Sequence, residues 1–210
     1  MRYLFFVLLG VFLITTCQKA PISNFDSETP ILPSTNYDYN SNKFAFDPID
    51  NDLATLGRVL FYDKKLSLNN RVSCGSCHIQ SLGFADNKAL SEGFSGMSTL
   101  RNSLAIINLN RFNSLFWDAR ENILDSMVVQ PILNHIEMGI SNLSQIESRI
   151  QKYSYYNALF FNAFGDNKID KDRIGKALAE FVKSIRNSDE FELKIKTIHN
   201  SEGGRLFAKY

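Results

Sequence analysis

Cys74-Gly75-Ser76-Cys77-His78 is the stretch of this sequence that decides its fold. Two cysteines three positions apart, followed directly by a histidine, are typical of a c-type haem attachment site. Each thiol can form a thioether bond to one haem vinyl group, and the histidine can bind the iron through an imidazole nitrogen. One helical turn starting near Cys74 would hold all three groups on one face. The spacing therefore predicts one covalently bound haem c, held by Cys74, Cys77 and His78.

Two other kinds of site share part of this pattern. A zinc site needs two further ligands, and the only other cysteine, Cys17, lies at the end of an apolar N-terminal segment. A thioredoxin-like redox pair needs no histidine and is usually found beside a βαβ pattern, which this sequence lacks. Haem attachment is therefore the interpretation that uses every residue of the motif.

The N-terminus has the pattern of an export signal. Arg2 precedes an apolar run over residues 3–14, which ends in two threonines and Cys17. A basic start and an apolar stretch of about a dozen residues are typical of a signal peptide, and a membrane span needs about 20 residues. A cysteine at the cleavage point predicts a lipoprotein-type signal over residues 1–16, with Cys17 lipidated and anchored to the membrane. An ordinary signal peptide that is cut a few residues later is the alternative.

The rest of the chain divides into a tether and one domain. Residues 17–47 contain three prolines among many Ser, Asn, Thr and Asp residues, and this composition predicts a flexible tether. Residues 48–210 are the right length for one domain with a real core. The net charge of +1 gives no reason to expect a nucleic acid partner.

This domain is predicted to be all-α, with long loops. Asp50 or Asn51 can cap a first helix, and Ser141-Asn142 can open a second, because apolar residues follow both at helical spacing. An aromatic helix is expected over residues 153–164, ended by Gly165.

The clearest amphipathic pattern runs over residues 170–186. Residues 79–117 are rich in Gly, Ser and Asn and are expected to be loops that haem helps to order. No stretch alternates as a strand would. The expected fold is therefore a c-type cytochrome-like haem domain.

Several further blocks resemble the bacterial di-haem cytochrome c peroxidase and MauG-like family. They stand in the family's order and spacing and comprise Leu56-Gly57-Arg58-Val59-Leu60-Phe61-Tyr62-Asp63, Leu66-Ser67, Val72-Ser73, Gly83-Phe84-Ala85-Asp86, Arg101-Asn102, Phe116-Trp117-Asp118-Ala119-Arg120 and Glu137-Met138-Gly139. The resemblance covers the N-terminal, peroxidatic haem domain. The family's second haem domain is absent, although residues 201–207 resemble the run just before its attachment motif. We therefore expect a truncated gene or an incomplete sequence; a single-haem descendant is the alternative.

The resemblance implies a function and a set of site residues. It implies a periplasmic enzyme that reduces hydrogen peroxide with electrons from a small redox protein, such as a cytochrome c or a cupredoxin. Glu137 matches the glutamate that moves a proton between the peroxide oxygens. Trp117 matches a candidate electron relay between the two haems, with a core aromatic residue as the alternative. Asn102 matches a ligand of an interdomain calcium ion, and Arg101 is a candidate partner of a haem propionate.

Two positions depart from the family pattern. Phe94, 16 residues after His78, stands where many members carry a histidine that blocks the resting iron. This difference predicts an open iron, and it resembles the MauG-like branch, which oxidises protein side chains. Met127 stands where the family can have a polar residue near Glu137.

A second hypothesis is a single-haem electron carrier, in which a methionine is the second iron ligand. Met138 lies 60 residues after His78 and is the first candidate; Met97 and Met127 are further ones. Methionine more often fills a core than binds iron. The two hypotheses predict different absorption spectra, because only iron bound to sulfur shows a charge-transfer band to sulfur.

Overall fold

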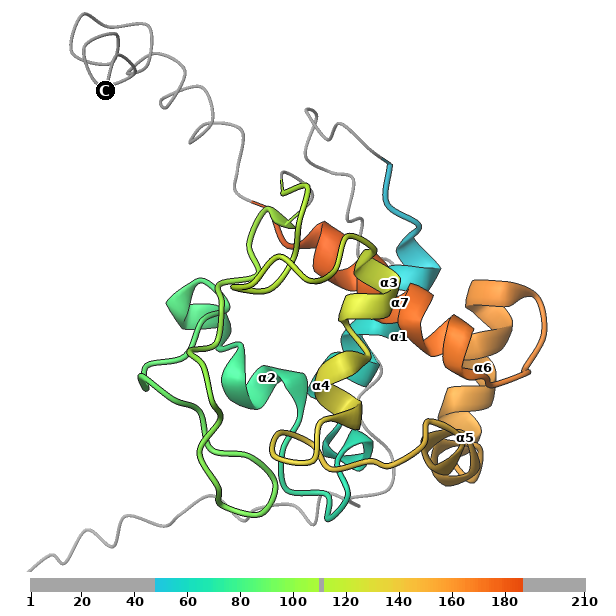
Figure 1. Ribbon diagram of the computed structural model, residues 1–210. Helices are drawn as coiled ribbons and strands as arrows, with labels where there is room; N and C mark the ends of the chain where they lie inside the picture. The colour runs from blue at the N-terminus through green and yellow to red at the C-terminus, as the bar shows by residue number, and fades with distance from the viewer. Residues whose placement is uncertain (1–47, 110–111, 187–210) are drawn as a thin grey trace, which may run out of the picture. The chain divides into compact units, whose positions relative to one another are not determined.

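The computed structural model describes residues 48–109 and 112–186, and its ordered elements are all helices (Figure 1). They are α1 (Asn51–Tyr62), η1 (Lys64–Leu66), α2 (Cys74–Cys77), η2 (Gln80–Leu82), α3 (Leu124–Met127), α4 (Gln130–Leu133), α5 (Ser144–Ile150), α6 (Ser154–Phe164) and α7 (Lys171–Ser184). The predicted all-α class is confirmed. The predictions for the signal peptide, Cys17, the tether and residues 201–207 fall outside the described residues. Within the described ranges, no helix is long and apolar enough to cross a membrane.

Three of the predicted helices, α1, α6 and α7, begin or end at the signals that their sequences carry, whereas α5 begins at Ser144, after an N-cap at Leu143, and not at the predicted Ser141-Asn142. The Asp50 side chain accepts a hydrogen bond from the Leu53 amide at 2.9 Å and caps α1. Asp170 caps α7 in the same way, through the Arg173 amide at 3.0 Å. Gly165 ends α6 with a φ of 78°, in the left-handed region that glycine adopts without strain. The aromatic and amphipathic patterns thus predicted both the type and the limits of these helices.

Helices α1 and α7 form the centre of the core, and their backbones approach closely. A Cβ atom at Gly57 of α1 would lie only 1.9 Å from the carbonyl oxygen of Ala177 in α7, so only glycine permits this crossing. The best-buried large side chains come from both helices and from the segments that pack on them: Leu56, Leu60, Leu66, Ile132, Ile140, Ile146, Ile150, Tyr156, Phe160, Ile174 and Leu178. This core supports the short helices α2, α3 and α4.

Loops make up most of the chain between α2 and α3, as predicted. In the described part of this region the ordered features are the single turn η2 and three isolated antiparallel bridges, which join Ile79 to Ala85, Glu92 to Ser98 and Leu115 to Glu121. No strand forms among the described residues. Figure 1 shows these loops on the side of α2 away from α5 and α6.

Candidate active site

The attachment motif forms the single helical turn α2 and packs against the end of α1. The Ser73 amide donates a hydrogen bond to the Ser76 hydroxyl at 2.9 Å, which closes the start of the turn. A Cβ atom at Gly75 would lie 2.6 Å from the Tyr62 ring, so the glycine inside the motif lets this ring cover the turn. The sequence around the two cysteines therefore fixes α2 on the core.

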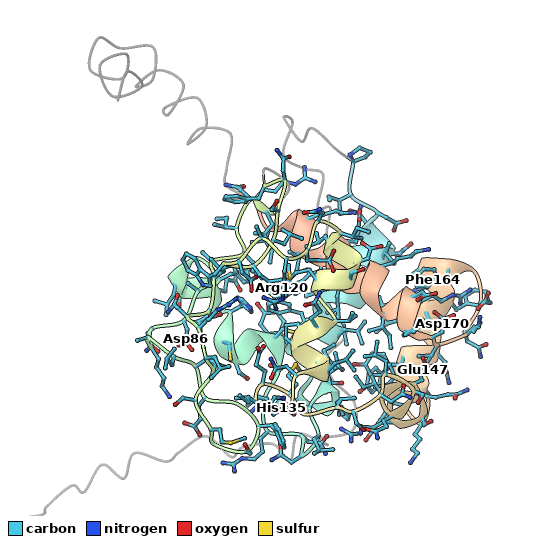
Figure 2. All side chains as sticks on the ribbon, viewed as in Figure 1. Asp86, Arg120, His135, Glu147, Phe164 and Asp170 are labelled. Carbon is cyan, nitrogen blue, oxygen red and sulfur yellow. The ribbon has the colours of Figure 1, made fainter. Side chains whose placement is uncertain are left out.

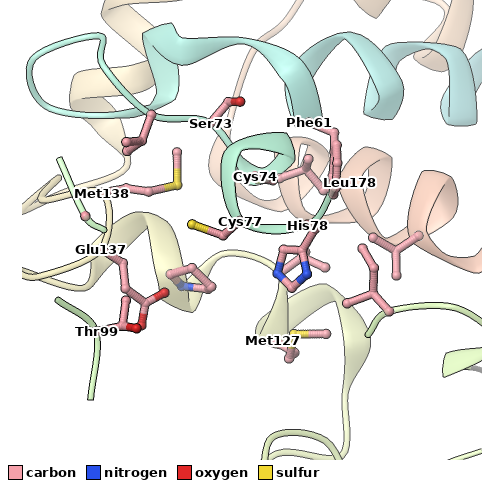
Figure 3. Close-up of a pocket in the computed structure, with 16 residues that line it drawn as sticks. Phe61, Ser73, Cys74, Cys77, His78, Thr99, Met127, Glu137, Met138 and Leu178 are labelled. Atoms are coloured by element: carbon pink, nitrogen blue, oxygen red, sulfur yellow. The ribbon is translucent and has the colours of Figure 1, made fainter. Parts of the chain in front are cut away.

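The three predicted attachment residues line one cavity. Its empty volume, which includes space open to solvent, is about 660 Å³. Besides Cys74, Cys77 and His78 it is lined mainly by apolar residues, including Phe61, Val72, Ile106, Val128, Pro131, Leu178 and Val182. Figure 3 shows the labelled residues around this common space. The spacing argument predicted this convergence.

His78 is prepared as an iron ligand by its other ring nitrogen. Nδ1 lies 3.0 Å from the Phe84 carbonyl oxygen and 3.3 Å from the Ser103 hydroxyl. The carbonyl favours the tautomer that carries its proton on Nδ1, which leaves Nε2 with its lone pair. Burial lowers the pKa of His78, so the imidazole is held neutral, as a metal ligand must be.

The two cysteines form no disulfide bond with each other, which leaves both sulfur atoms for thioether bonds. Burial raises the pKa of Cys74 to about 12 and also raises the pKa of Cys77, so both stay protonated. Two reduced cysteines and a neutral imidazole on an apolar wall fit a covalently attached haem. Attachment through these residues stays a prediction.

Glu137 lies on the wall of the same cavity, in the loop after α4. The Asn134 side-chain amide donates a hydrogen bond to its Oε1 at 2.9 Å, and the Asn134 oxygen accepts one from the Ile136 amide at 2.9 Å. Burial raises the pKa of Glu137, and the positive charge of Arg120 partly opposes this rise. A half-buried, oriented carboxyl group with a raised pKa can both accept and donate a proton.

The loop that carries Phe94 packs against the loop that carries Glu137. The Phe94 amide donates to the Glu137 carbonyl oxygen at 2.8 Å. The Phe94 ring packs on Gly139, where a Cβ atom would lie 2.4 Å from the ring. Gly93 lines the cavity, and the Phe94 side chain faces Gly139 instead. Phe94 thus helps to hold the Glu137 loop.

The methionines proposed as iron ligands differ in position. Met127 and Met138 both line the cavity, whereas Met97 is 50% exposed and lies outside its lining. Met138 is almost fully buried, and Met127 is half-buried at the end of α3. Met127 and Glu137 thus line the same cavity, although they come from different elements.

The other predicted site residues lie at the surface, outside the cavity lining. Trp117 is 61% exposed, and its indole N–H donates to the Asn102 carbonyl oxygen at 2.9 Å. The alternative that Trp117 is a core aromatic residue is therefore wrong. Arg101 is also exposed and pairs with Asp118 at 2.5 Å. The Asn102 side-chain amide donates to the carbonyl oxygens of Lys88 and Ala89, each at 3.1 Å.

Among the described residues, no group of three or more His, Cys, Asp or Glu side chains could hold a metal ion. The roles of Asn102, Arg101 and Trp117 stay predictions.

The sequence interpretation missed Asn134 and Arg120. Asn134 precedes Glu137 by three residues, and an asparagine just after a helix is a common turn former, which was the available signal. Arg120 lies with its guanidinium 3.6 Å above the Phe116 ring, pairs with Asp118 at 2.8 Å and contacts Gln130 at 3.4 Å. Arg120 is exposed, and Figure 2 labels it.

Comparison with known proteins gives consistent matches over this region. Residues 51–196 match the family profile of di-haem cytochrome c peroxidases. The chain is 33% identical over 139 residues to the methylamine utilization protein MauG of Methylophilus methylotrophus, covering 66% of this chain and 41% of that protein. It is 33% identical over 141 residues to the cytochrome c551 peroxidase of Nitrosomonas europaea, covering 67% of this chain and 42% of that one.

A solved structure matches as well. The crystal structure of a MauG-like protein associated with microbial copper homeostasis superposes with a TM-score of 0.63 at 31% identity. The match covers 67% of this chain and 42% of that one. The chain thus spans about two fifths of the length of these relatives.

Proposed function

This chain belongs to the di-haem cytochrome c peroxidase family, and on that premise we propose that its described domain is a peroxidatic site that reduces hydrogen peroxide. Membership of the family implies a c-type haem cofactor. We propose one haem in this chain, attached through Cys74 and Cys77, with His78 as the iron ligand. Bound haem supplies the redox-active iron at which a peroxide is reduced.

The observation that carries this proposal is the carboxyl group of Glu137 on the wall of the cavity that the attachment residues line. Cleavage of a peroxide needs a base for the proton on one oxygen and an acid for the oxygen that leaves as water. One carboxyl group can do both in turn. Asn134 holds Glu137 through the 2.9 Å hydrogen bond, and burial keeps its pKa high enough for the protonated form to return the proton.

Glu137→Gln tests this role, because the amide keeps the size of the side chain and cannot shuttle a proton. We expect the haem-loaded variant to react with hydrogen peroxide about 10²–10⁴-fold more slowly in stopped-flow absorbance. Glu147→Gln makes the same chemical change on α5, outside the cavity lining, and should leave the rate unchanged. A slowing of less than about threefold in Glu137→Gln would exclude it as the acid–base group.

The electron-carrier alternative is favoured by one observation, the two methionines on the cavity wall. Met138 or Met127 bound to the iron would give a low-spin spectrum with a charge-transfer band to sulfur and would resist cyanide. The peroxidase proposal requires an open iron that binds cyanide without prior reduction, which agrees with Phe94 in place of a ligating histidine. An absorption spectrum with and without cyanide separates the two functions.

We also propose the partners and location that family membership suggests. A small redox protein would supply electrons, and Trp117 is a suitable relay because its exposed ring can be approached from outside. Export to the periplasm and a lipid anchor on Cys17 follow from the N-terminal sequence. Mass spectrometry of the N-terminal peptide of membrane-bound protein tests the anchor.

A further inference from the structure

Met127 has a position that the proposed peroxide chemistry leaves without a role. It is the last residue of α3, and its side chain is half-buried and lines the cavity together with Glu137 and His78. Four sulfur side chains line the cavity. Two belong to the attachment cysteines and one to Met138, which is only 4% exposed, so Met127 carries the accessible sulfur that haem attachment does not use. A thioether readily accepts one oxygen atom to become a sulfoxide.

We propose that Met127 is a self-oxidation site, whose sulfur takes an oxygen atom from peroxide that enters the cavity. The sulfur lone pair attacks one peroxide oxygen, the O–O bond breaks, and an S–O bond forms. The proton on the attacked oxygen must move to the departing oxygen, which leaves as water. Sulfur is oxidised by two electrons and peroxide is reduced by two, so no other reactant is needed. This inference rests on the proposed function only in placing peroxide beside Glu137.

Glu137 is placed to assist the transfer. The required proton movement, from one peroxide oxygen to the other, is the same movement that the proposed peroxidase reaction needs. Glu137 and Met127 both line the cavity, so a peroxide that enters it meets both side chains as part of one lining. The sulfoxide would add a polar oxygen to a wall that is otherwise apolar. Oxidation by peroxide would thus give Met127 a polar side chain.

The other methionines of the domain make this inference specific. Met97 is 50% exposed outside the cavity lining and reports oxidation by peroxide in bulk solution. Met138 lines the cavity but is only 4% exposed, so little of it is accessible to a small molecule. If peroxide in solution oxidises the protein, Met97 should be oxidised first. If oxidation takes place inside the cavity, Met127 should be oxidised first.

The test is peptide mass spectrometry of the full haem-loaded chain after brief exposure to a small excess of hydrogen peroxide. We expect the mass of one added oxygen on Met127 at least about tenfold sooner than on Met97. Glu137→Gln should slow oxidation of Met127 and leave that of Met97 unchanged, and cyanide should protect Met127 selectively. Met127→Leu should remove the early product without transferring it to Met97. Oxidation in the order of exposure, with Met97 first, would overturn the inference.

The same samples separate this inference from the proposed function. If the haem spectrum responds to peroxide in a Glu137-dependent way while Met127 stays unmodified, the inference fails and the peroxidase proposal stands. If Met127 is oxidised first but Glu137→Gln changes neither the haem response nor the sulfoxide yield, the assigned role of Glu137 fails and Met127 is still a cavity oxidation site.

Discussion

At the residue scale, the proposed chemistry depends on the charge around Glu137. Burial favours its protonated form, and Arg120 favours the carboxylate. Arg120 is itself held by Asp118, whose pKa is lowered to about 2 by hydrogen bonds to Arg101 and Arg120. The lowered pKa favours the charged form of Asp118, which pairs with Arg120 at 2.8 Å. The protonation of Glu137 is thus set by a balance that substitution of Arg120 can shift.

This balance predicts the pH dependence of the peroxide reaction. Glu137 must begin as a carboxylate to accept the first proton, so the rate should rise with pH through its pKa, which burial places above that of an ordinary glutamate. Arg120→Gln removes the opposing charge and should move this acid limb to higher pH; Arg120→Lys keeps the charge and should move it less. Stopped-flow rates measured across pH check this. An unmoved acid limb in Arg120→Gln, or an acid limb that survives in Glu137→Gln, would contradict the assignment.

The sequence predicts that residues join the site more readily when they lie close together along the chain. Cys74, Cys77 and His78 lie within one helical turn, so their spacing alone predicted that they converge. Glu137 was proposed only from the family resemblance, because nothing local brings it to a motif 59 residues earlier. Asn134 carried only the weak local signal of a turn-forming residue three positions before Glu137, and Arg120 acts on Glu137 through a charge interaction formed only in the folded chain.

At the element scale, the loop after α4 decides whether Glu137 is presented correctly. Gly139 has a φ of 75°, and its missing Cβ makes room for the Phe94 ring. The Leu68 amide donates to the Met138 carbonyl oxygen at 2.8 Å, and the Gly139 amide donates to the Asn134 carbonyl oxygen at 2.8 Å. The segments that carry Leu68 and Phe94 therefore both contact the loop after α4. Gly139 is required there because the Phe94 ring leaves no room for a Cβ atom.

Gly139→Ala should therefore cost more stability than the same change at Gly165. Gly165 has nearly the same φ, 78°, but an added Cβ there meets nothing within 4 Å. Gly165→Ala should cost about 1–2 kcal/mol from the left-handed backbone alone, and Gly139→Ala should cost about 1–3 kcal/mol more from overpacking. Urea unfolding of the haem-loaded proteins, followed by circular dichroism, measures both.

Peroxide kinetics and a double variant refine this comparison. Only Gly139→Ala should also slow the reaction with peroxide, because it displaces the Glu137 loop. Combining it with Phe94→Leu should recover part of the lost stability, since a smaller side chain relieves the contact. Equal destabilisation by the two alanine substitutions would show that the Phe94 contact does not constrain the loop.

The length of an element decided how well the sequence predicted it. The periodic patterns of α1, α6 and α7 extend over three or more turns, and their capping residues marked the ends. Helices α3 and α4 have one turn each, which is too short to show a period, although they carry Met127 and position the Glu137 loop. Packing against α7, rather than helix propensity, holds such short segments, as at Gly175, where an added Cβ would lie 2.9 Å from the Asp125 carbonyl oxygen.

At the scale of the whole molecule, the supply of electrons is expected to limit the turnover of peroxide. Reduction of hydrogen peroxide to water consumes two electrons, while the 210 residues contain one haem attachment motif. The chain spans about two fifths of the relatives that it matches, and the family's members are di-haem proteins. Trp117, at 61% exposure, together with other exposed apolar side chains of the loops, Leu100, Phe112 and Ile123, offers surfaces where a further redox partner could approach.

We therefore predict that this chain, loaded with one haem, reacts rapidly with a first equivalent of peroxide and then turns over poorly. One iron supplies fewer reducing equivalents than a turnover consumes, so oxidation of the chain's own side chains should compete with electron delivery. Stopped-flow mixing measures the first reaction, and oxidation of a reduced cytochrome c or cupredoxin measures steady-state turnover. Trp117→Phe should lower the second rate and leave the first unchanged, because the ring lies outside the cavity lining. Many sustained turnovers by the wild-type chain, with no loss of active protein, would show that one haem is sufficient.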